Sequence, residues 1–278
     1  MRSSLKLVIL ILVVSSLSCS DTKLKKYYYL DGLRILSMVL SAPEVSSSTS
    51  SVTLTPLVSD PRGQGRTLTW RAETCVDPGI AYGAADCSTS ATRTDLGTGT
   101  VSGLSSPNYT ASVGSLTVPI LSVALYGRDS NTQFNGVAQV VFYTVQTQDG
   151  QSITAVRRIV ISTNPIKNSN PSFTVLNANG SQLTSLPSST VNSVTTDISN
   201  ASKEVYSYRQ SDGTEETAQE QLTTTFFASE GNFGATRLID FDSTSYTPPA
   251  SRPDGRGIVI VVVVRDGRGG EANLVVNL

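Results

Sequence analysis

Alternating apolar and polar residues dominate the chain from residue 33 onward. A period of two places every second side chain on one face of a strand. Pro56 interrupts one such run, which indicates a sheet edge or a bulge because proline donates no ladder hydrogen bond. The pattern predicts short strands over 33–40, 51–60, 67–75, 115–120, 122–127, 190–199, 204–211 and 221–229. Residues 76–110 and 215–220 lack clear alternation, and we expect loops there.

Three turn signals lie between β-rich arms and predict hairpins. They are Gln148-Asp149-Gly150, Asn179-Gly180 and Asp266-Gly267, in which Gly and Asn supply the positive φ that tight hairpins need. The arm 257–264 is apolar at consecutive positions. It therefore predicts a central strand covered on both faces, or covered by a partner.

The hairpins at 136–162 and 257–278 share one layout, and each closes about half of the chain. This internal repeat predicts two copies of one architecture. The polar, Pro- and Asn-rich segment 163–171 marks the boundary between them. The predicted fold class is all-β, with two tandem Ig-like β-sandwich domains at 31–164 and 165–278.

The N-terminus reads as an export signal. A basic start precedes the apolar run Leu7–Leu17, which is too short to span a bilayer but typical of a signal peptide. Because Cys19 follows at once, residues 1–18 resemble a bacterial lipoprotein signal peptide, and the resemblance implies lipidation of Cys19. The alternative is ordinary cleavage after Ser20. Residues 19–30 are expected to form a tether.

Cysteine and charge content narrow the chemistry. Of three cysteines, Cys75 and Cys87 remain for a disulfide in an oxidising compartment. The chain has no histidine, which excludes Ser-His-Asp catalysis, His-ligated zinc and a histidine pH switch. Lys and Arg number 21 against 22 Asp and Glu, so no charge excess favours nucleic acid. No cofactor is expected.

Three short motifs have simpler interpretations than the functional ones they suggest. The RGG-like string 265–270 is expected to be a hairpin turn, and 97–103 a flexible loop rather than a nucleotide-binding loop. Asp240 and Asp242 are weak calcium candidates, because calcium needs six to eight oxygen ligands. The simpler expectation is that both are strand-end acids facing water.

Several segments together resemble bacterial Ig-like or PKD-like domains: LRILSMVLSAPEV (33–45), FFASEGNF (226–233) and VVVVRDGRGG (261–270). The set is similar to tandem-domain envelope lipoproteins of the deltaproteobacterial type. The resemblance implies an exported β-sandwich protein and no particular activity. Unlike antibody-type domains, this chain has a local cysteine pair, so Trp70 is expected to fill a core without an inter-sheet disulfide.

The sequence therefore predicts a non-enzymatic lipoprotein anchored in the outer membrane, periplasmic or at the cell surface. Held to the membrane through Cys19, it would act as a protein-binding or scaffolding module. The alternative is a surface adhesin or glycan-binding protein. In that case the loops of 76–110 would hydrogen-bond the sugar, and calcium held by Asp240 and Asp242 would assist binding. No catalytic residues and no nucleic-acid partner are expected.

Overall fold

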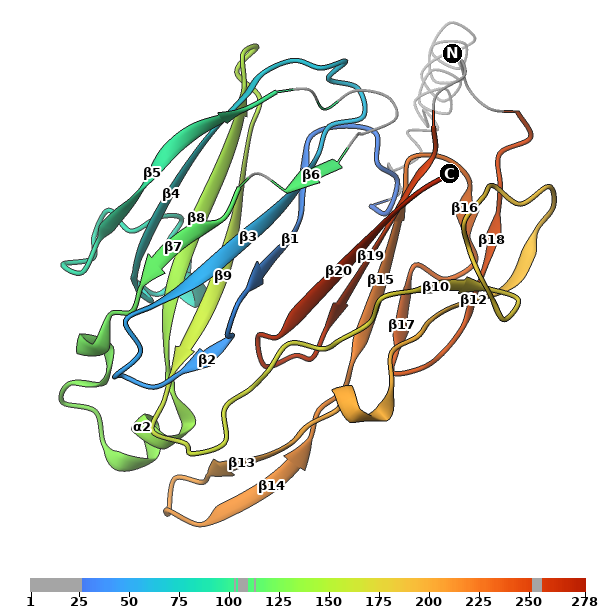
Figure 1. The fold of residues 1–278 in the computed structure, drawn as a ribbon. Helices are drawn as coiled ribbons and strands as arrows, with labels where there is room; N and C mark the ends of the chain where they lie inside the picture. The colour runs from blue at the N-terminus through green and yellow to red at the C-terminus, as the bar shows by residue number, and fades with distance from the viewer. Residues whose placement is uncertain (1–26, 103, 105–109, 113, 252–256) are drawn as a thin grey trace, which may run out of the picture.

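The regular secondary structure of the chain is almost entirely β-strand, as the alternating pattern predicts (Figure 1). The computed structural model describes residues 27–102, 104, 110–112, 114–251 and 257–278. The predicted signal peptide 1–18 and Cys19 lie outside these residues. In the described part of the chain, no helix is long and apolar enough to cross a membrane.

The N-terminal half, residues 33–162, forms a sandwich of two sheets around one core. Leu54, Leu68 and Tyr143 have no exposed surface in this core. One sheet contains β1 (Arg34–Leu40), β3 (Ser51–Ser59), β6 (Thr110–Ser112) and β7 (Leu116–Pro119). The other has the order β2 (Glu44–Val45), β9 (Ser152–Ile161), β8 (Val137–Thr147), β4 (Leu68–Val76) and β5 (Thr94–Val101).

The C-terminal half, residues 172–278, packs two further sheets around a second core that includes Phe226 and Tyr246. One sheet has the order β17 (Arg237–Ile239), β15 (Thr223–Ala228), β19 (Val259–Arg265) and β20 (Glu271–Asn277). The other has the order β11 (Ser181–Gln182), β10 (Leu176–Ala178), β12 (Val191–Thr196), β18 (Thr244–Thr247) and β16 (Asn232–Phe233). A hairpin of β13 (Val205–Arg209) and β14 (Glu215–Gln219) stands apart.

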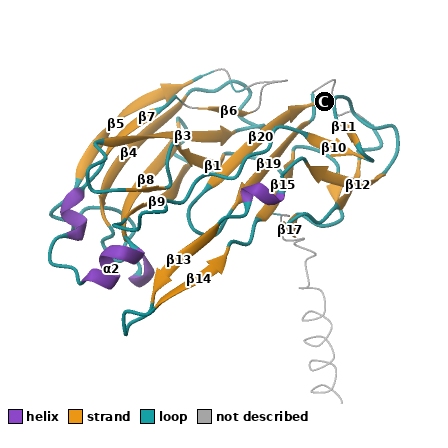
Figure 2. Cartoon of the chain, turned by 60° about the horizontal axis from the view of Figure 1, so that its bottom comes forward, coloured by secondary structure: helices purple, strands orange, loops and turns teal. Residues whose placement is uncertain are grey.

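The described helices are short. They are η1 (Ile80–Tyr82), η2 (Ser122–Leu125), α2 (Ser130–Asn135) and η3 (Asn200–Ser202). Figure 2 shows α2 beside the β13–β14 hairpin of the other half. Arg209 N–H donates to Asn135 Oδ1 at 2.7 Å, and Asn135 Nδ2 donates to Arg209 O at 2.7 Å. The hairpin is therefore tied to the N-terminal half.

The apolar run predicted as a doubly covered strand is β19, which lies between β15 and β20. Its even-numbered side chains over Val259–Val264 face the C-terminal core. Its odd-numbered side chains pack with Leu30, Leu36 and Leu57 in a third cluster, between the halves. Burying a valine contributes about 1.5 kcal/mol or more, so the outer face of β19 joins the two sandwiches firmly.

Residues 27–30 are not a free tether. Leu30 N–H donates to Ala228 O at 2.8 Å, and Ala228 N–H donates to Tyr28 O at 3.1 Å. Leu30 is only 1% exposed. The tether prediction is wrong for these four residues, because their backbone extends a sheet of the C-terminal half and Leu30 enters the apolar cluster between the halves. Residues 19–26 lie outside the described chain.

The predicted boundary segment 163–171 is bonded to both halves. Asn170 Nδ2 donates to Leu40 O at 2.6 Å, and Asn168 N–H donates to Glu44 Oε2 at 3.0 Å. Asn164 Nδ2 donates to Ser207 O at 2.9 Å. This segment is therefore a packed joint between the halves.

The three predicted hairpins are confirmed, at 148–151, 179–180 and 266–270. The halves also share a three-strand arrangement, because β4-β8-β9 in the first corresponds to β15-β19-β20 in the second. Pro56 lies in the central strand β3 rather than at an edge. It sits opposite the break between β7, which pairs as far as Leu54, and β6, which pairs from Leu57.

Three local predictions are wrong. The loop expected over 76–110 contains β5, whose Gly97 and Gly99 hide the alternation. The strand expected over 122–127 is the turn η2, which buries Ala124 and Leu125 in the core. The loop expected at 215–220 is β14, which pairs with β13 across the Asp212-Gly213 turn.

Candidate functional site

The disulfide predicted between Cys75 and Cys87 is present, with Cα atoms 5.9 Å apart. It ties the 77–93 loop onto the outer face of the five-stranded sheet of the N-terminal half, which contains β4 and β8. There both cysteines form a small apolar cluster with Val140 and Phe142. Glu73 Oε1 accepts the Cys87 N–H at 2.9 Å, which fixes the loop a second time. Because this loop is anchored covalently, the surfaces beside it are preorganised.

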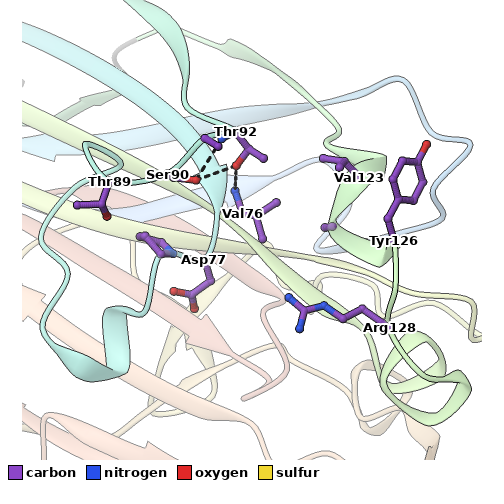
Figure 3. Close-up of a pocket in the computed structure, with 11 residues that line it drawn as sticks. Val76, Asp77, Thr89, Ser90, Thr92, Val123, Tyr126 and Arg128 are labelled. Atoms are coloured by element: carbon purple, nitrogen blue, oxygen red, sulfur yellow. Dashed lines mark hydrogen bonds between the residues drawn. The ribbon is translucent and has the colours of Figure 1, made fainter.

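A pocket of about 330 Å³ opens between the 77–93 loop and the 120–136 segment. Figure 3 shows Asp77, Ser90 and Thr92 on its disulfide-tied side, and Tyr126 and Arg128 opposite. Thr92 Oγ1 accepts the Val76 N–H at 2.9 Å. Asp77 Oδ1 accepts N–H groups of the following turn. The polar side chains on the tied side therefore hold the loop as well as line the pocket.

Large exposed apolar side chains lie on the two segments that form this pocket and on the joint that follows β9. Tyr82 is 95% exposed and Tyr126 is 74% exposed. Val123, in the pocket wall, and Ile166, in the joint after β9, are also exposed. We call this surface, made by residues 77–93, 120–136 and 162–170, the loop end. Exposed tyrosines on Ser-, Thr- and Gly-rich loops are typical of protein-recognition surfaces.

A second depression lies on the outer face of the five-stranded sheet of the N-terminal half. One part, of about 480 Å³, runs beside the disulfide-tied loop, and another, of about 340 Å³, continues along β4 and β5. Arg71, Thr98 and Thr144 line both parts. We call this continuous depression the sheet groove. Its residues were not singled out from the sequence, because only strand pairing brings them together.

The RGG-like string 265–270 is a hairpin turn, as predicted, and its arginines bond across the halves. Arg268 Nη2 donates to Glu44 Oε2 at 2.9 Å, and Arg268 Nη1 donates to Glu220 Oε1 at 3.0 Å. The guanidinium also lies 4.2 Å from the ring centre of Tyr206. Burial raises the pKa of Glu220, while its bonds to the Glu204 N–H and to Arg268 oppose the rise.

A buried ion pair reinforces this contact. Arg157 Nη1 of β9 donates to Glu271 Oε2 of β20 at 2.8 Å. Burial lowers the pKa of Arg157, and the Glu271 carboxylate acts in the opposite direction. Glu220 and Arg157, whose pKa values burial shifts, therefore both take part in contacts that hold the two halves together.

Asp240 and Asp242 lie in the turn after β17 and not on a strand. Asp240 has a φ of 53°, accepts the Leu222 N–H at 3.1 Å and pairs with Lys203 Nζ at 3.0 Å. Its carboxylate is thus used in a turn. Within the described ranges, no three His, Cys, Asp or Glu side chains cluster to hold a metal ion. Trp70 is half-buried and stacks on Tyr143, with ring centres 5.8 Å apart.

Comparisons with known proteins place the chain in no family. No family model matches it, and no curated protein matches it. Among solved structures, red sea bream transglutaminase matches 88% of this chain and 31% of its own, at 9% identity and a TM-score of 0.27. Dimeric latent PorU from Porphyromonas gingivalis matches 90% and 24%, at 8% identity and a TM-score of 0.21. The chain thus spans less than a third of the length of either protein.

Proposed function

We propose that this protein is a non-enzymatic binding module of the outer envelope, held by a lipid on Cys19, which engages a protein partner through its loop end. The observation that carries the proposal is the pair of exposed tyrosines at the loop end. Tyr126 lines the pocket, and Tyr82 lies on the disulfide-tied loop that forms the other side of the pocket. Aromatic anchors around a concave centre are what protein interfaces use for most of their binding energy.

The placement of the N-terminal segment supports this orientation. Tyr29 bridges to Ala228, and β1 then runs from Arg34 towards the loop end (Figure 1). Cys19 precedes Tyr27 by eight residues, which reach at most about 29 Å when extended. A lipid at Cys19 would hold the Tyr27 side of the protein near the membrane and present the loop end away from it.

The firm junction between the halves supports a presenting role. The apolar contacts of β19 and the Arg268–Glu44 ion pair oppose independent swinging of the two sandwiches. A rigid support loses little conformational entropy on binding, which favours affinity. Loops fixed by a disulfide on such a support are suited to recognition.

Photocrosslinking in intact cells tests the binding surface. A photoreactive phenylalanine analogue is placed at Tyr82 or Tyr126, and at Arg62 as a control, because Arg62 lies in the turn after β3 at the opposite end. We expect one discrete protein adduct from each loop-end position and none from Arg62. Equal adducts from all three positions, or none from Tyr82 and Tyr126, would contradict the proposal.

The anchor is tested separately by metabolic labelling with a tagged fatty acid. We expect label in the wild-type protein and none in Cys19→Ala, which should leave the envelope-bound fraction. An unlabelled wild-type protein would support cleavage after Ser20 and contradict lipid anchoring. Neither result bears on the loop end itself, so the two parts of the proposal fail independently.

A further inference from the structure

The outer face of the five-stranded sheet of the N-terminal half presents two rows of side chains that cross its strands. Strand pairing aligns Thr98 of β5 with Arg71 of β4, Arg71 with Thr144 of β8, and Thr144 with Thr154 of β9. The adjacent row, two residues along each strand, consists of Thr100, Thr69, Gln146 and Ser152. Seven of these eight positions carry hydroxyl or amide groups, and Arg71 supplies the one charge.

All of these side chains except Ser152 line the sheet groove. Its part along β4 and β5, of about 340 Å³, is lined by Thr69, Thr98, Thr100 and Gln146 as well as Arg71. The disulfide-tied loop walls the other part, of about 480 Å³. A ligand lying along the groove would therefore contact a surface of hydroxyl and amide groups with one guanidinium at its centre.

Arg71 differs from its basic neighbours on this face. Arg93 donates to Glu73 Oε2 at 2.8 Å, and Arg158 lies 3.7 Å from Asp77. Within the described ranges, the Arg71 side chain makes no hydrogen bond or ion pair, and it acts electrostatically on Asp86, whose pKa is lowered mainly by hydrogen bonds from Ser88. Asp86 itself accepts the Ser88 N–H at 2.9 Å. The Arg71 guanidinium is thus available to a ligand.

The acidic side chains of the groove are confined to the loop side. Glu73 is held by Arg93 and the Cys87 N–H, and Asp95 Oδ1 accepts the Gly97 N–H at 2.8 Å. Along β4 and β5 the lining has no acidic residue. A guanidinium binds a carboxylate with two parallel hydrogen bonds, and an anionic group is therefore best accommodated at Arg71 with its chain extending over the Thr69 row.

From this arrangement we propose that the sheet groove binds a linear saccharide bearing carboxylates, of the uronic-acid class. Arg71 pairs with a carboxylate, and the hydroxyl rows exchange hydrogen bonds with the sugar hydroxyls, which act as both donors and acceptors as theirs do. An extended peptide fits less well, because it would seek backbone partners at a sheet edge, and this site is a sheet face. The site is distinct from the loop end and does not depend on it.

The single tryptophan of the chain, Trp70, lies between Thr69 and Arg71 on β4, with its ring stacked on Tyr143 on the inner face of the sheet. Its ring is therefore across the sheet from a ligand in the groove, and the heat of binding is the primary readout. The folded chain is titrated with hexameric oligogalacturonate while Trp70 fluorescence and heat of binding are followed. The comparison ligands are the same hexamer as its methyl ester, hexaglutamate and inorganic phosphate. We expect saturable binding of the oligogalacturonate, with each comparison ligand at least tenfold weaker.

Variants separate the groove from the rest of the sheet. We expect Arg71→Gln to weaken binding at least tenfold, Arg71→Lys to weaken it less, and Thr144→Val to weaken it about threefold, as for one lost hydrogen bond. Arg158→Gln, on the same face but outside the groove, should bind as the wild type does. Near-UV circular dichroism confirms that each variant is folded.

Three results would overturn the proposal. They are absence of binding to folded wild-type protein, equal binding by Arg71→Gln, or equal binding of the methyl ester. Tighter binding of hexaglutamate would assign the groove to an acidic peptide, and tighter binding of phosphate would assign it to a small anion; both contradict a saccharide site. None of these outcomes depends on the loop-end adducts.

Discussion

Truncation of Glu271 measures how firmly the two halves are joined. The side chain is 2% exposed. One carboxylate oxygen accepts from Arg157 Nη1 at 2.8 Å, and the other accepts from Arg265 Nη2 at 3.1 Å and from the Met38 N–H at 3.3 Å. Glu271→Ala leaves the buried Arg157 guanidinium without the carboxylate to which it donates, and with Asp266 as the remaining acidic group that acts on it. Breaking one side of such a pair costs about 3–5 kcal/mol.

Guanidinium chloride unfolding, followed by both Trp70 fluorescence and far-UV circular dichroism, is the assay. With a slope of about 4 kcal/mol per molar, the expected loss lowers the midpoint by about 1 M. The double variant Arg157→Met with Glu271→Leu removes both charges and should recover most of the loss, because well-packed apolar pairs often replace buried ion pairs without cost. Arg62→Ala, whose ion-pair distance to Asp31 is 3.7 Å at the surface, should change the midpoint little.

The reasoning would be refuted by a loss below about 1 kcal/mol in Glu271→Ala, the range of an exposed ion pair. It would also be refuted by a double variant as unstable as the single one, since the penalty would then not come from an uncompensated charge. Separate transitions for fluorescence, which reports the first half, and for circular dichroism would show that the halves unfold independently.

Three further predictions concern local features of the fold: the disulfide, a closely packed glycine and a helix N-cap. Replacing Cys75 and Cys87 by serine should cost about 3 kcal/mol for this short loop, read as a lower unfolding midpoint than that of oxidised wild type. Gly99→Ala should cost roughly 1–3 kcal/mol by overpacking, with a changed near-UV signal, because a Cβ there would lie 2.7 Å from the Trp70 ring. Asp129→Ala should speed amide exchange in α2, because Asp129 Oδ1 caps its first turn.

The Asp129 prediction includes a pH dependence. A hydrogen bond from the Thr132 hydroxyl lowers the pKa of Asp129 below its ordinary value of 3.8. A depressed folded-state pKa gives stability that is present above pH 3.8 and is lost as the pH falls through the folded value. Protection of α2 in wild type should decline over that range, and in Asp129→Ala this component should be missing. An unchanged acid profile in the variant would contradict the assignment.

Each of these variants has a control. Gly32→Ala should be neutral, because no atom lies within 4 Å of the added Cβ; a loss equal to that of Gly99→Ala would point to a general effect of glycine replacement. If the Cys75 and Cys87 double variant kept full stability, the loop would not need its covalent tie. Asp129→Asn, which keeps an acceptor, should retain most of the α2 protection.

The elements that could be predicted from sequence are those whose cause is local. The hairpins at Gly150, Gly180 and Gly267 were predictable because each glycine adopts a positive φ, between 81° and 88°. The disulfide was predictable from cysteine parity together with the predicted export. By contrast, β5 was missed because Gly99 presents no side chain to the alternation, and its place on the inner face is taken by Trp70 of the neighbouring strand.

The surfaces proposed to bind depend on long-range pairing, which local patterns do not contain. The alternation around Trp70 indicates that Arg71 faces away from the core. Only the register between β4, β5 and β8 shows that Thr98 and Thr144 flank it. Similarly, Arg268 was assigned to a turn, while its partner Glu44 lies 224 residues away in the sequence.

Oxidative footprinting in living cells tests the binding role of the loop end most directly. Val123 at the loop end and Val156 on the sheet face are a matched pair, with exposed fractions of 42% and 41%. Both, together with Tyr126, are labelled in purified protein and in intact cells. The account predicts that labelling of Val123 and Tyr126 falls several-fold in cells relative to Val156. Equal relative labelling of the two valines in cells and in solution would contradict it.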